Sequence, residues 1–254
     1  MLKGLSDTVR QHDPDRFFTA LFAAAEKRDT LLALYAFNHE LARAREVVSE
    51  PHLALIRLHW WREVVQGISK RHPVAATITL ALANGTLHAP DLLALIDARE
   101  MEADAEISTI GDWRAYLLGT AGGLVVTAAR LLGAGDPDAF RPLGAAYGAA
   151  GVLRAVPALA RHGRCLLPAD ILAKHGLSPE AVVSGADSGA AIRELAGEGR
   201  AFLRTMKFPR ATIAAALPAV LARRDLRRLP APPTPRGIGD KLAVTWAAFT
   251  GRIG

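Results

Sequence analysis

Apolar residues recur at helical spacing along nearly the whole of this 254-residue chain. Two regular series show the pattern: Leu31, Leu34, Tyr35, Leu41 and Ala42, then Leu53, Ile56, Trp60, Val64 and Ile68. Spacings of three and four residues are typical of amphipathic helices. No segment shows the sustained alternation of apolar and polar residues, rich in β-branched side chains, that a strand requires. The sequence therefore predicts an all-α protein.

Prolines and polar turns divide the pattern into separate helices. After the two series above, helices are predicted at residues 73–84, 89–107, 110–133, 137–157, 187–207, 210–226 and 238–252. The stretch LPAPPTPRG, residues 229–237, predicts an extended and exposed linker. We therefore expect a helical domain over residues 1–228, this linker, and a C-terminal helix within residues 238–254.

The composition supports a large buried core in a reducing compartment. Half of the residues are hydrophobic and 22% are charged, which excludes a disordered chain. The single cysteine, Cys165, excludes an internal disulfide framework and a cysteine-based zinc site. The first residues lack the apolar core of a signal peptide, and no uninterrupted apolar run reaches the roughly 18–20 residues that span a bilayer. We expect a cytoplasmic protein, with peripheral attachment to the inner membrane left open.

The net charge is +6, and basic residues gather near the C-terminus. They are Arg223, Arg224, Arg227 and Arg228, followed by Arg236 and Lys241. Such a cluster suits anionic lipid, an acidic protein or nucleic acid, and a solvated helix end is the simpler interpretation. The chain has no aromatic RNA platform, zinc finger or helix-turn-helix pattern, so we expect no nucleic acid partner.

Two segments resemble the signature helices of the squalene/phytoene synthase family. They read LLALYAFNHELARARE (residues 31–46) and GVLRAVPALARHGRCLLP (residues 151–168). IDAREMEADAE (96–106) and YLLGTAGGLVV (116–126) resemble further helices of the family, and the resemblance runs from about residue 13 to 228. It implies the isoprenoid synthase fold, a single helical domain around a central cavity. The glycines of the last segment indicate close helix packing or room at that cavity.

Members of that family join two prenyl diphosphates head to head, and each signature helix holds Mg²⁺ with aspartates. In register, those positions fall at Ala42, Arg43 and Glu46 in the first segment, and at Ala155 and Leu159 in the second. Mg²⁺ prefers hard oxygen ligands, and of these residues only Glu46 supplies them. The resemblance therefore implies a degenerate site, without catalytic residues and without a cofactor.

Other residues within the resembling segments are candidates for binding an anion or another ligand. They are Tyr35, His39, Arg43, Glu46, Tyr116, Arg154 and Arg164. Arginine grips phosphate with two parallel hydrogen bonds, so binding can survive where turnover does not. His39, Arg43 and Glu46 are also spaced to pair with one another on one helix. Asp97, Glu100 and Asp104 form a possible substitute metal site, and a solvated acidic stripe is the alternative interpretation.

The string AFNHELARAREVVSEPHLALIRLHWWREVV resembles a divergent branch of the family that is associated with assembly of respiratory complex I. This resemblance implies a non-catalytic role, with a protein partner in respiratory complex assembly and an isoprenoid or anionic lipid as a candidate ligand. The Ala- and Arg-rich composition suits a bacterial member. The alternative is an active prenyltransferase that binds Mg²⁺ through relocated carboxylates, Glu46 with Asp97, Glu100 and Asp104. A third hypothesis is a membrane-surface adaptor that uses residues 223–241 and the helix containing Trp246.

Overall fold

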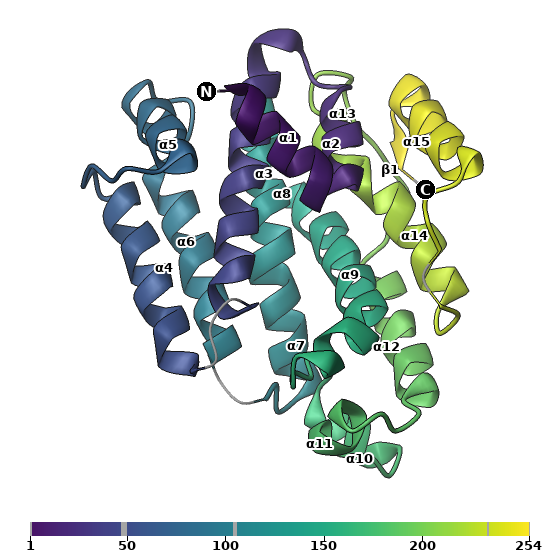
Figure 1. Cartoon of the computed structure of the whole chain (residues 1–254). Helices are drawn as coiled ribbons and strands as arrows, with labels where there is room; N and C mark the ends of the chain where they lie inside the picture. The colour runs from purple at the N-terminus through teal and green to yellow at the C-terminus, as the bar shows by residue number, and fades with distance from the viewer. Residues whose placement is uncertain (1, 47–49, 104–105, 233, 254) are drawn as a thin grey trace.

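The computed structural model describes residues 2–46, 50–103, 106–232 and 234–253, and the chain is helical nearly throughout (Figure 1). In chain order the helices are α1 (Leu2–His12), α2 (Pro14–Ala20), α3 (Ala25–Glu46), α4 (Pro51–Val65), α5 (Pro73–Ala83), α6 (Ala89–Glu100), α7 (Ile110–Leu117), α8 (Gly123–Leu132), α9 (Arg141–Arg161), α10 (Ala169–Lys174), α11 (Pro179–Val183), α12 (Gly189–Ala201), α13 (Ile213–Ala216), α14 (Pro218–Arg228) and α15 (Ile238–Thr250). The prediction of an all-α protein is confirmed.

Short irregular elements interrupt the helices. They are 3₁₀ turns at Met101–Ala103 and Asp138–Phe140, a π-helical turn at Leu118–Gly122, and two-residue strands β1 (Met206–Lys207) and β2 (Arg252–Ile253). The strands pair antiparallel, with Met206 opposite Ile253, a small exception to the prediction of no strands. Gly251, with φ of 72°, makes the turn that this pairing requires. The helices predicted at 89–107 and 187–207 end earlier, at Glu100 and Ala201.

Several helices begin where the sequence supplies a cap. The Asp13 carboxylate accepts a hydrogen bond from the Arg16 backbone N–H at 3.0 Å, and Pro14 opens α2. Thr109 and Asp112 form a reciprocal capping box at the start of α7. These interactions satisfy backbone donors that a helix leaves free in its first turn. Local sequence therefore fixes where these helices start.

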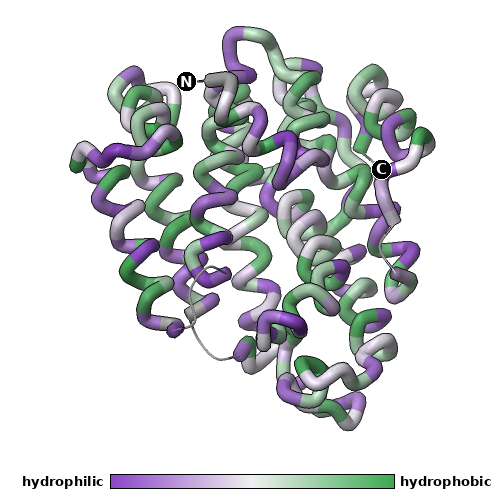
Figure 2. The backbone as a smooth tube through the Cα atoms, viewed as in Figure 1, coloured by the Kyte–Doolittle hydropathy of each residue, from purple (hydrophilic) through white to green (hydrophobic). Residues whose placement is uncertain are grey.

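The two signature segments form α3 and the second half of α9. Residues 31–38 of α3 are all buried, and α3 packs against α1, α4, α5 and α8 near the middle of the molecule (Figure 1). α9 packs against α12, α14 and the π-helical turn. Hydrophobic positions are spread over all of these helices (Figure 2). The fold therefore builds both signature segments into its core.

Close packing explains the glycines between α7 and α9. A Cβ on Gly119 would lie 2.9 Å from the Ala98 Cβ, and one on Gly122 would lie 3.0 Å from the Arg141 carbonyl oxygen. On α9, a Cβ on Gly144 would lie 2.3 Å from the Ala121 carbonyl oxygen. Of the two interpretations of these glycines, close packing holds at these positions.

Gly144→Ala is expected to lower the free energy of unfolding by about 1–3 kcal/mol, because its Cβ meets backbone that can move only with the helix. The matched control is Gly151→Ala on the same helix, where a Cβ would meet nothing within 4 Å. That variant is expected to gain up to about 1 kcal/mol, since alanine favours the helix. Urea unfolding measures both changes, and equal effects at the two positions would contradict this packing.

Two continuous helical stretches are long and apolar enough to cross a membrane by length and composition, Ile110–Leu132 and Asp138–Arg161. The most apolar window of the first is 72% buried inside the protein, and that of the second is 44% buried. Core helices have the same length and composition. Here both stretches pack against other helices of the domain.

Candidate functional site

The motif positions lie on α3 and α9 without a set of oxygen ligands. Ala42, Arg43, Ala155 and Leu159 are half-buried, and Glu46 is exposed. The Arg43 guanidinium lies 3.7 Å from the Glu40 carboxylate, one turn earlier on α3. This pair takes the place of the pairing expected among His39, Arg43 and Glu46.

His39 instead stacks on His12 from α1, with 4.4 Å between ring centroids. Burial and the neighbouring His12 lower the pKa of His39. A neutral imidazole is therefore favoured at His39. In register with the family motif, His39 stands where the motif has an arginine-like residue. A neutral ring does not supply the positive charge that an anion site needs.

A buried carboxylate, Glu102, lies at the centre of the best-defined polar cluster. The Tyr116 hydroxyl donates to its Oε1 at 2.8 Å, and the Arg164 guanidinium donates to its Oε2 at 3.0 Å. Arg99 also forms an ion pair with it. We call Arg99, Glu102, Tyr116 and Arg164 the Glu102 cluster. It brings together two of the candidate residues, Tyr116 and Arg164, through a carboxylate that sequence analysis did not single out.

The charges within the Glu102 cluster balance one another. Burial acts to raise the pKa of Glu102, but Arg99, Arg164 and the hydrogen bonds they and Tyr116 donate outweigh it, and the net pKa is below its ordinary value. Burial also raises the pKa of Tyr116. Glu102 is therefore a carboxylate anion at neutral pH, and it accepts from two cations and a hydroxyl.

Another buried arginine, Arg16 on α2, lies beside Tyr35. Its guanidinium donates to the Asp13 carboxylate at 2.8 Å, and lies 4.6 Å from the Tyr147 ring centroid and 5.7 Å from that of Tyr35. The Tyr35 hydroxyl is buried and has no hydrogen-bond partner within the described parts of the chain. Burial raises the pKa of Tyr35 strongly. Tyr35 is thus a neutral side chain of the core.

Arg154 belongs to a third cluster, which joins the two ends of the chain. It donates to Asp225 at 2.9 Å, and Arg236 bridges Asp225 to Asp15 with contacts of 2.6–2.9 Å. We call Arg154, Asp225, Arg236 and Asp15 the Arg236 cluster. Segment 229–237, expected to be an exposed linker, is therefore held to the helical body by a half-buried arginine.

A carboxylate also neutralises part of the C-terminal basic cluster. Asp240 accepts from Arg224 at 2.6 Å and pairs with Arg228 at 3.5 Å. Burial acts to raise the pKa of Asp240, but these arginines and the Gly237 N–H hold it below its ordinary value. Two of the arginines in the basic cluster of residues 223–241 are therefore paired with a carboxylate of the same chain.

Two residues of the substitute acidic site, Asp97 and Glu100, are paired with an arginine. Arg62 from α4 donates to Asp97 at 2.6 Å and to Glu100 at 2.7 Å, and both carboxylates are exposed. Asp104 lies outside the described residues. Within the described ranges, no three His, Cys, Asp or Glu side chains converge as metal ligands would. The donors that the structure describes thus do not fit Mg²⁺ held against a diphosphate.

Side chains fill the domain centre around Glu102. A pocket of about 40 Å³ lies beside it, lined by residues that include Arg45, Glu102, Arg164 and Cys165. That volume holds only a few waters. It is far smaller than the roughly 300–1,000 Å³ typical of ligand sites.

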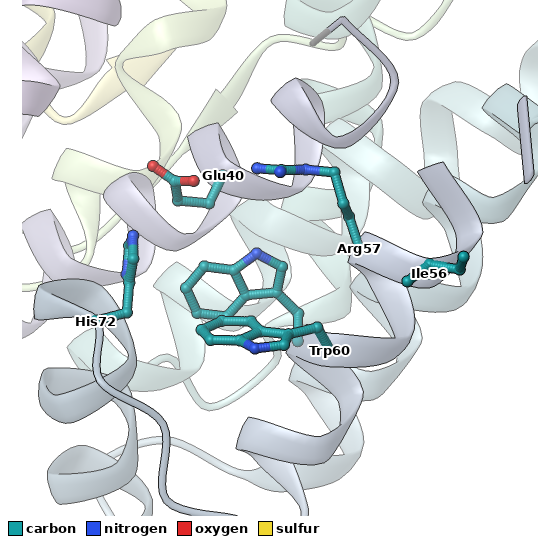
Figure 3. A pocket seen from close by; sticks show the side chains of 6 residues that line it. Glu40, Ile56, Arg57, Trp60 and His72 are labelled. Carbon is teal, nitrogen blue, oxygen red and sulfur yellow. The ribbon is translucent and has the colours of Figure 1, made fainter. Parts of the chain in front are cut away.

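A larger pocket, of about 300 Å³, lies between α3, α4 and the start of α5 (Figure 3). Its lining residues are Glu40, Ile56, Arg57, Trp60, Trp61 and His72. Trp61 is buried and Trp60 is half-buried, because adjacent residues on a helix point about 100° apart. The Arg57 guanidinium extends toward Glu40, while Ile56 points away from the other labelled side chains (Figure 3). The pocket therefore has an aromatic floor with one cation and one carboxylate at its rim.

Solved structures with this arrangement of helices are prenyl-joining enzymes. A ligand-bound dehydrosqualene synthase superposes with a TM-score of 0.77 at 15% identity, covering 98% of this chain and 95% of that one. Squalene synthase HpnC from Alicyclobacillus acidocaldarius gives a TM-score of 0.62 at 17% identity, with the same coverage. At such low identity the likeness shows the isoprenoid synthase fold and nothing finer.

Curated relatives carry a different description. NADH dehydrogenase (ubiquinone) complex I, assembly factor 6, from Homo sapiens is 30% identical over 182 residues, 68% of this chain and 55% of that protein. The Bos taurus protein of the same name is 31% identical over the same length, and the Drosophila melanogaster homolog 26% over 188 residues. The chain thus matches about half the length of these relatives.

The sequence model of the squalene/phytoene synthase family matches residues 9–245. That span runs from α1 into α15 and includes α3, α9, the Glu102 cluster and the Arg236 cluster. The solved structures share the fold, and the curated relatives resemble the divergent branch that the sequence indicated. This chain belongs to the squalene/phytoene synthase family.

Proposed function

We propose that this chain acts by binding, in the assembly of a respiratory NADH dehydrogenase, and that it does not join prenyl diphosphates. The names of its curated relatives support the first half. The second half is carried by one observation. By the family resemblance, four of the metal-ligand positions fall at residues without a carboxylate, which are Ala42, Arg43, Ala155 and Leu159. The buried carboxylate of Glu102 is paired with Arg99 and Arg164 instead of being free to bind a metal ion.

Ionising a prenyl diphosphate requires stabilisation of the leaving pyrophosphate, which Mg²⁺ supplies when it is bound. The two oxygens of Glu102 already accept from Arg99, Arg164 and Tyr116, and both arginines would oppose a bound cation there. The prenyltransferase alternative requires Glu46, Asp97, Glu100 and Asp104 to converge. Glu46 is exposed, Arg62 pairs with Asp97 and Glu100 at the surface, and Asp104 lies outside the described residues. The binding role is therefore favoured.

Retained arginines do not by themselves make a diphosphate site. Arg154 donates to Asp225, and Arg164 donates to Glu102. Arg43 is 42% exposed, and its contact with Glu40 is long, at 3.7 Å. At Arg154 or Arg164 a diphosphate would have to displace an internal carboxylate, which leaves a buried charge unpaired. A protein partner at the surface requires no such rearrangement.

Purified protein incubated with farnesyl or geranylgeranyl diphosphate and Mg²⁺ is expected to release no more pyrophosphate than a protein-free reaction. A dehydrosqualene synthase run in parallel shows that the assay detects the family's reaction. Release of pyrophosphate together with a new hydrocarbon product would overturn the non-catalytic half of the proposal.

Deleting the gene tests the other half. The deletion strain is expected to lose assembled NADH dehydrogenase on native gels and to keep its isoprenoid profile, and a plasmid copy is expected to restore assembly. Normal assembly in the deletion strain, or a lost isoprenoid product that the plasmid copy restores, would contradict the assembly role.

A further inference from the structure

The outer face of α15 is an unpartnered apolar stripe. Ile238, Leu242, Trp246 and Phe249 are 77%, 63%, 72% and 66% exposed. Spacings of four, four and three residues put these side chains on one face of the helix. The opposite face packs inward through Val244, Ala247 and Ala248. We call Ile238, Leu242, Trp246 and Phe249 the outer stripe.

α15 lies at the edge of the molecule, beside α14 (Figure 1). Much of this outer helix is coloured as hydrophobic in Figure 2. A run of four large apolar side chains on one exposed face is unusual, because isolated surface hydrophobics are normally scattered. The stripe therefore needs a covering surface.

Four exposed cations lie on α15 or on the segments that adjoin it. Lys241 lies on α15 itself, Arg252 follows it in β2, and Lys207 faces Arg252 across the strand pair. The Arg210 guanidinium lies 5.8 Å from the centre of the Phe249 ring. Over the parts of the chain that the structure describes, none of these four pairs with a carboxylate. The carboxylate of α15, Asp240, is instead buried and occupied by Arg224 and Arg228.

The apolar surface continues beyond α15. A small pocket of about 140 Å³ joins Phe249 and Ala248 to Phe22, Arg210 and Ile213. Beside it, Leu21 is 45% exposed. The turn after α2 thus extends the stripe, with Arg210 at its margin.

We propose that the outer stripe lies on an anionic lipid bilayer, with Trp246 and Phe249 at the headgroup level and the four cations among the phosphates. Trp, Phe and Leu flanked by Lys and Arg are the composition of helices that lie in the membrane interface. The thirteen residues of α15 span about 20 Å, too short to cross the bilayer. The unpaired cations favour anionic lipid over an uncharged protein surface.

This proposal does not rest on the assembly role. It concerns a surface formed by α15, β1, β2 and the loop after β1, away from the Glu102 cluster. Vesicle binding by this face does not depend on catalytic activity, so the vesicle experiment and the pyrophosphate experiment fail independently.

Flotation with phospholipid vesicles tests the proposal on the full chain. The protein is expected to float with vesicles of equal parts phosphatidylglycerol and phosphatidylcholine. With pure phosphatidylcholine, the floating fraction is expected to fall about tenfold, since each cation near an anionic surface adds to binding. Raising the salt concentration is expected to weaken flotation. Trp246 fluorescence is expected to shift to shorter wavelength on the anionic vesicles only.

The paired change Leu242→Glu with Trp246→Glu is expected to reduce flotation by about tenfold or more, because two glutamates replace apolar anchors on an anionic surface. Leu80→Glu is the matched control, since Leu80 on α5 is 61% exposed and far along the chain from α15. It is expected to float like the unaltered protein. Far-ultraviolet circular dichroism checks that all variants remain folded.

Three results would overturn the proposal. One is failure of the unaltered protein to float with anionic vesicles. Another is an equal loss of flotation in Leu80→Glu. The third is concentration-dependent dimerisation that the Leu242→Glu, Trp246→Glu variant abolishes while flotation persists, which would assign the outer stripe to a second copy of the chain.

Discussion

Glu102→Gln is expected to lower the free energy of unfolding by about 3–5 kcal/mol, the range seen when one partner of a buried ion pair is removed. Glu102 is 8% exposed, and it is the carboxylate that faces both Arg99 and Arg164. Glutamine keeps the size of the side chain but leaves two buried guanidinium groups without an anion. Urea unfolding followed by circular dichroism measures the change.

Glu100→Gln is the matched control for this prediction. Glu100 lies two residues earlier, is 46% exposed and pairs with Arg62, which keeps its contact with Asp97. Surface pairs of this kind contribute about 0–1 kcal/mol. Similar losses for the two variants would show that Glu102 is not the anion that holds the cluster together.

The pH dependence of stability gives the Glu102 prediction a second readout. The folded-state pKa of Glu102 is below its ordinary value of 4.5, so its stabilising effect is fully present above pH 4.5 and is lost as pH falls through the lower folded value. The stability difference between the unaltered protein and Glu102→Gln is therefore expected to shrink below pH 4.5. A difference that stays constant down to the acid transition would contradict this assignment.

The helical architecture was predictable because it depends on local patterns. Apolar spacing located α3, α4, α5 and α9 to within a few residues, and the signature segments located the family. The missing carboxylates at Ala42, Arg43, Ala155 and Leu159 were also legible in the sequence alone. Helical spacing repeats every three or four residues, and motif residues are read directly from the sequence. Neither prediction therefore depends on tertiary contacts.

Glu102 escaped sequence analysis because it belongs to a segment rich in charged residues. The sequence predicted one helix over residues 89–107 and a solvated surface for its charges, although Glu102 follows the buried Leu95 by seven residues, which is two helical turns. The structure ends α6 at Glu100 and continues as a 3₁₀ turn. The partners that neutralise Glu102 include Arg164, 62 positions away, which no local pattern indicates. Glu102 points inward, while Glu100 stays at the surface with Arg62.

Arg236 escaped sequence analysis for a different reason. Its partner Asp15 lies 221 positions away in the chain, and no periodic pattern links residues at that distance. The surrounding prolines predict an extended segment, but they carry no information about a long-range ion pair. Arg236 anchors this part of the chain to Asp15 and Asp225.

Arg236→Met is expected to lower the free energy of unfolding by about 3–5 kcal/mol, because it leaves the buried carboxylates of Asp15 and Asp225 without their shared cation. Methionine keeps the apolar stem, so lost packing contributes little. The change also releases segment 229–237 from α2 and α14, and faster hydrogen exchange in α15 is expected to accompany the lower stability.

The control for Arg236 is Arg227→Met, at an exposed arginine of the same basic cluster that pairs with no carboxylate in the described part of the chain. Surface substitutions of this kind stay within about 0.5 kcal/mol. Urea unfolding and hydrogen exchange on both variants separate charge pairing from the removal of positive charge as such. If both variants lose stability equally, or if α15 exchanges no faster in Arg236→Met, then Arg236 does not join the two ends of the chain. If only Arg236→Met changes, one buried arginine secures both the first helices and the helix that carries the outer stripe.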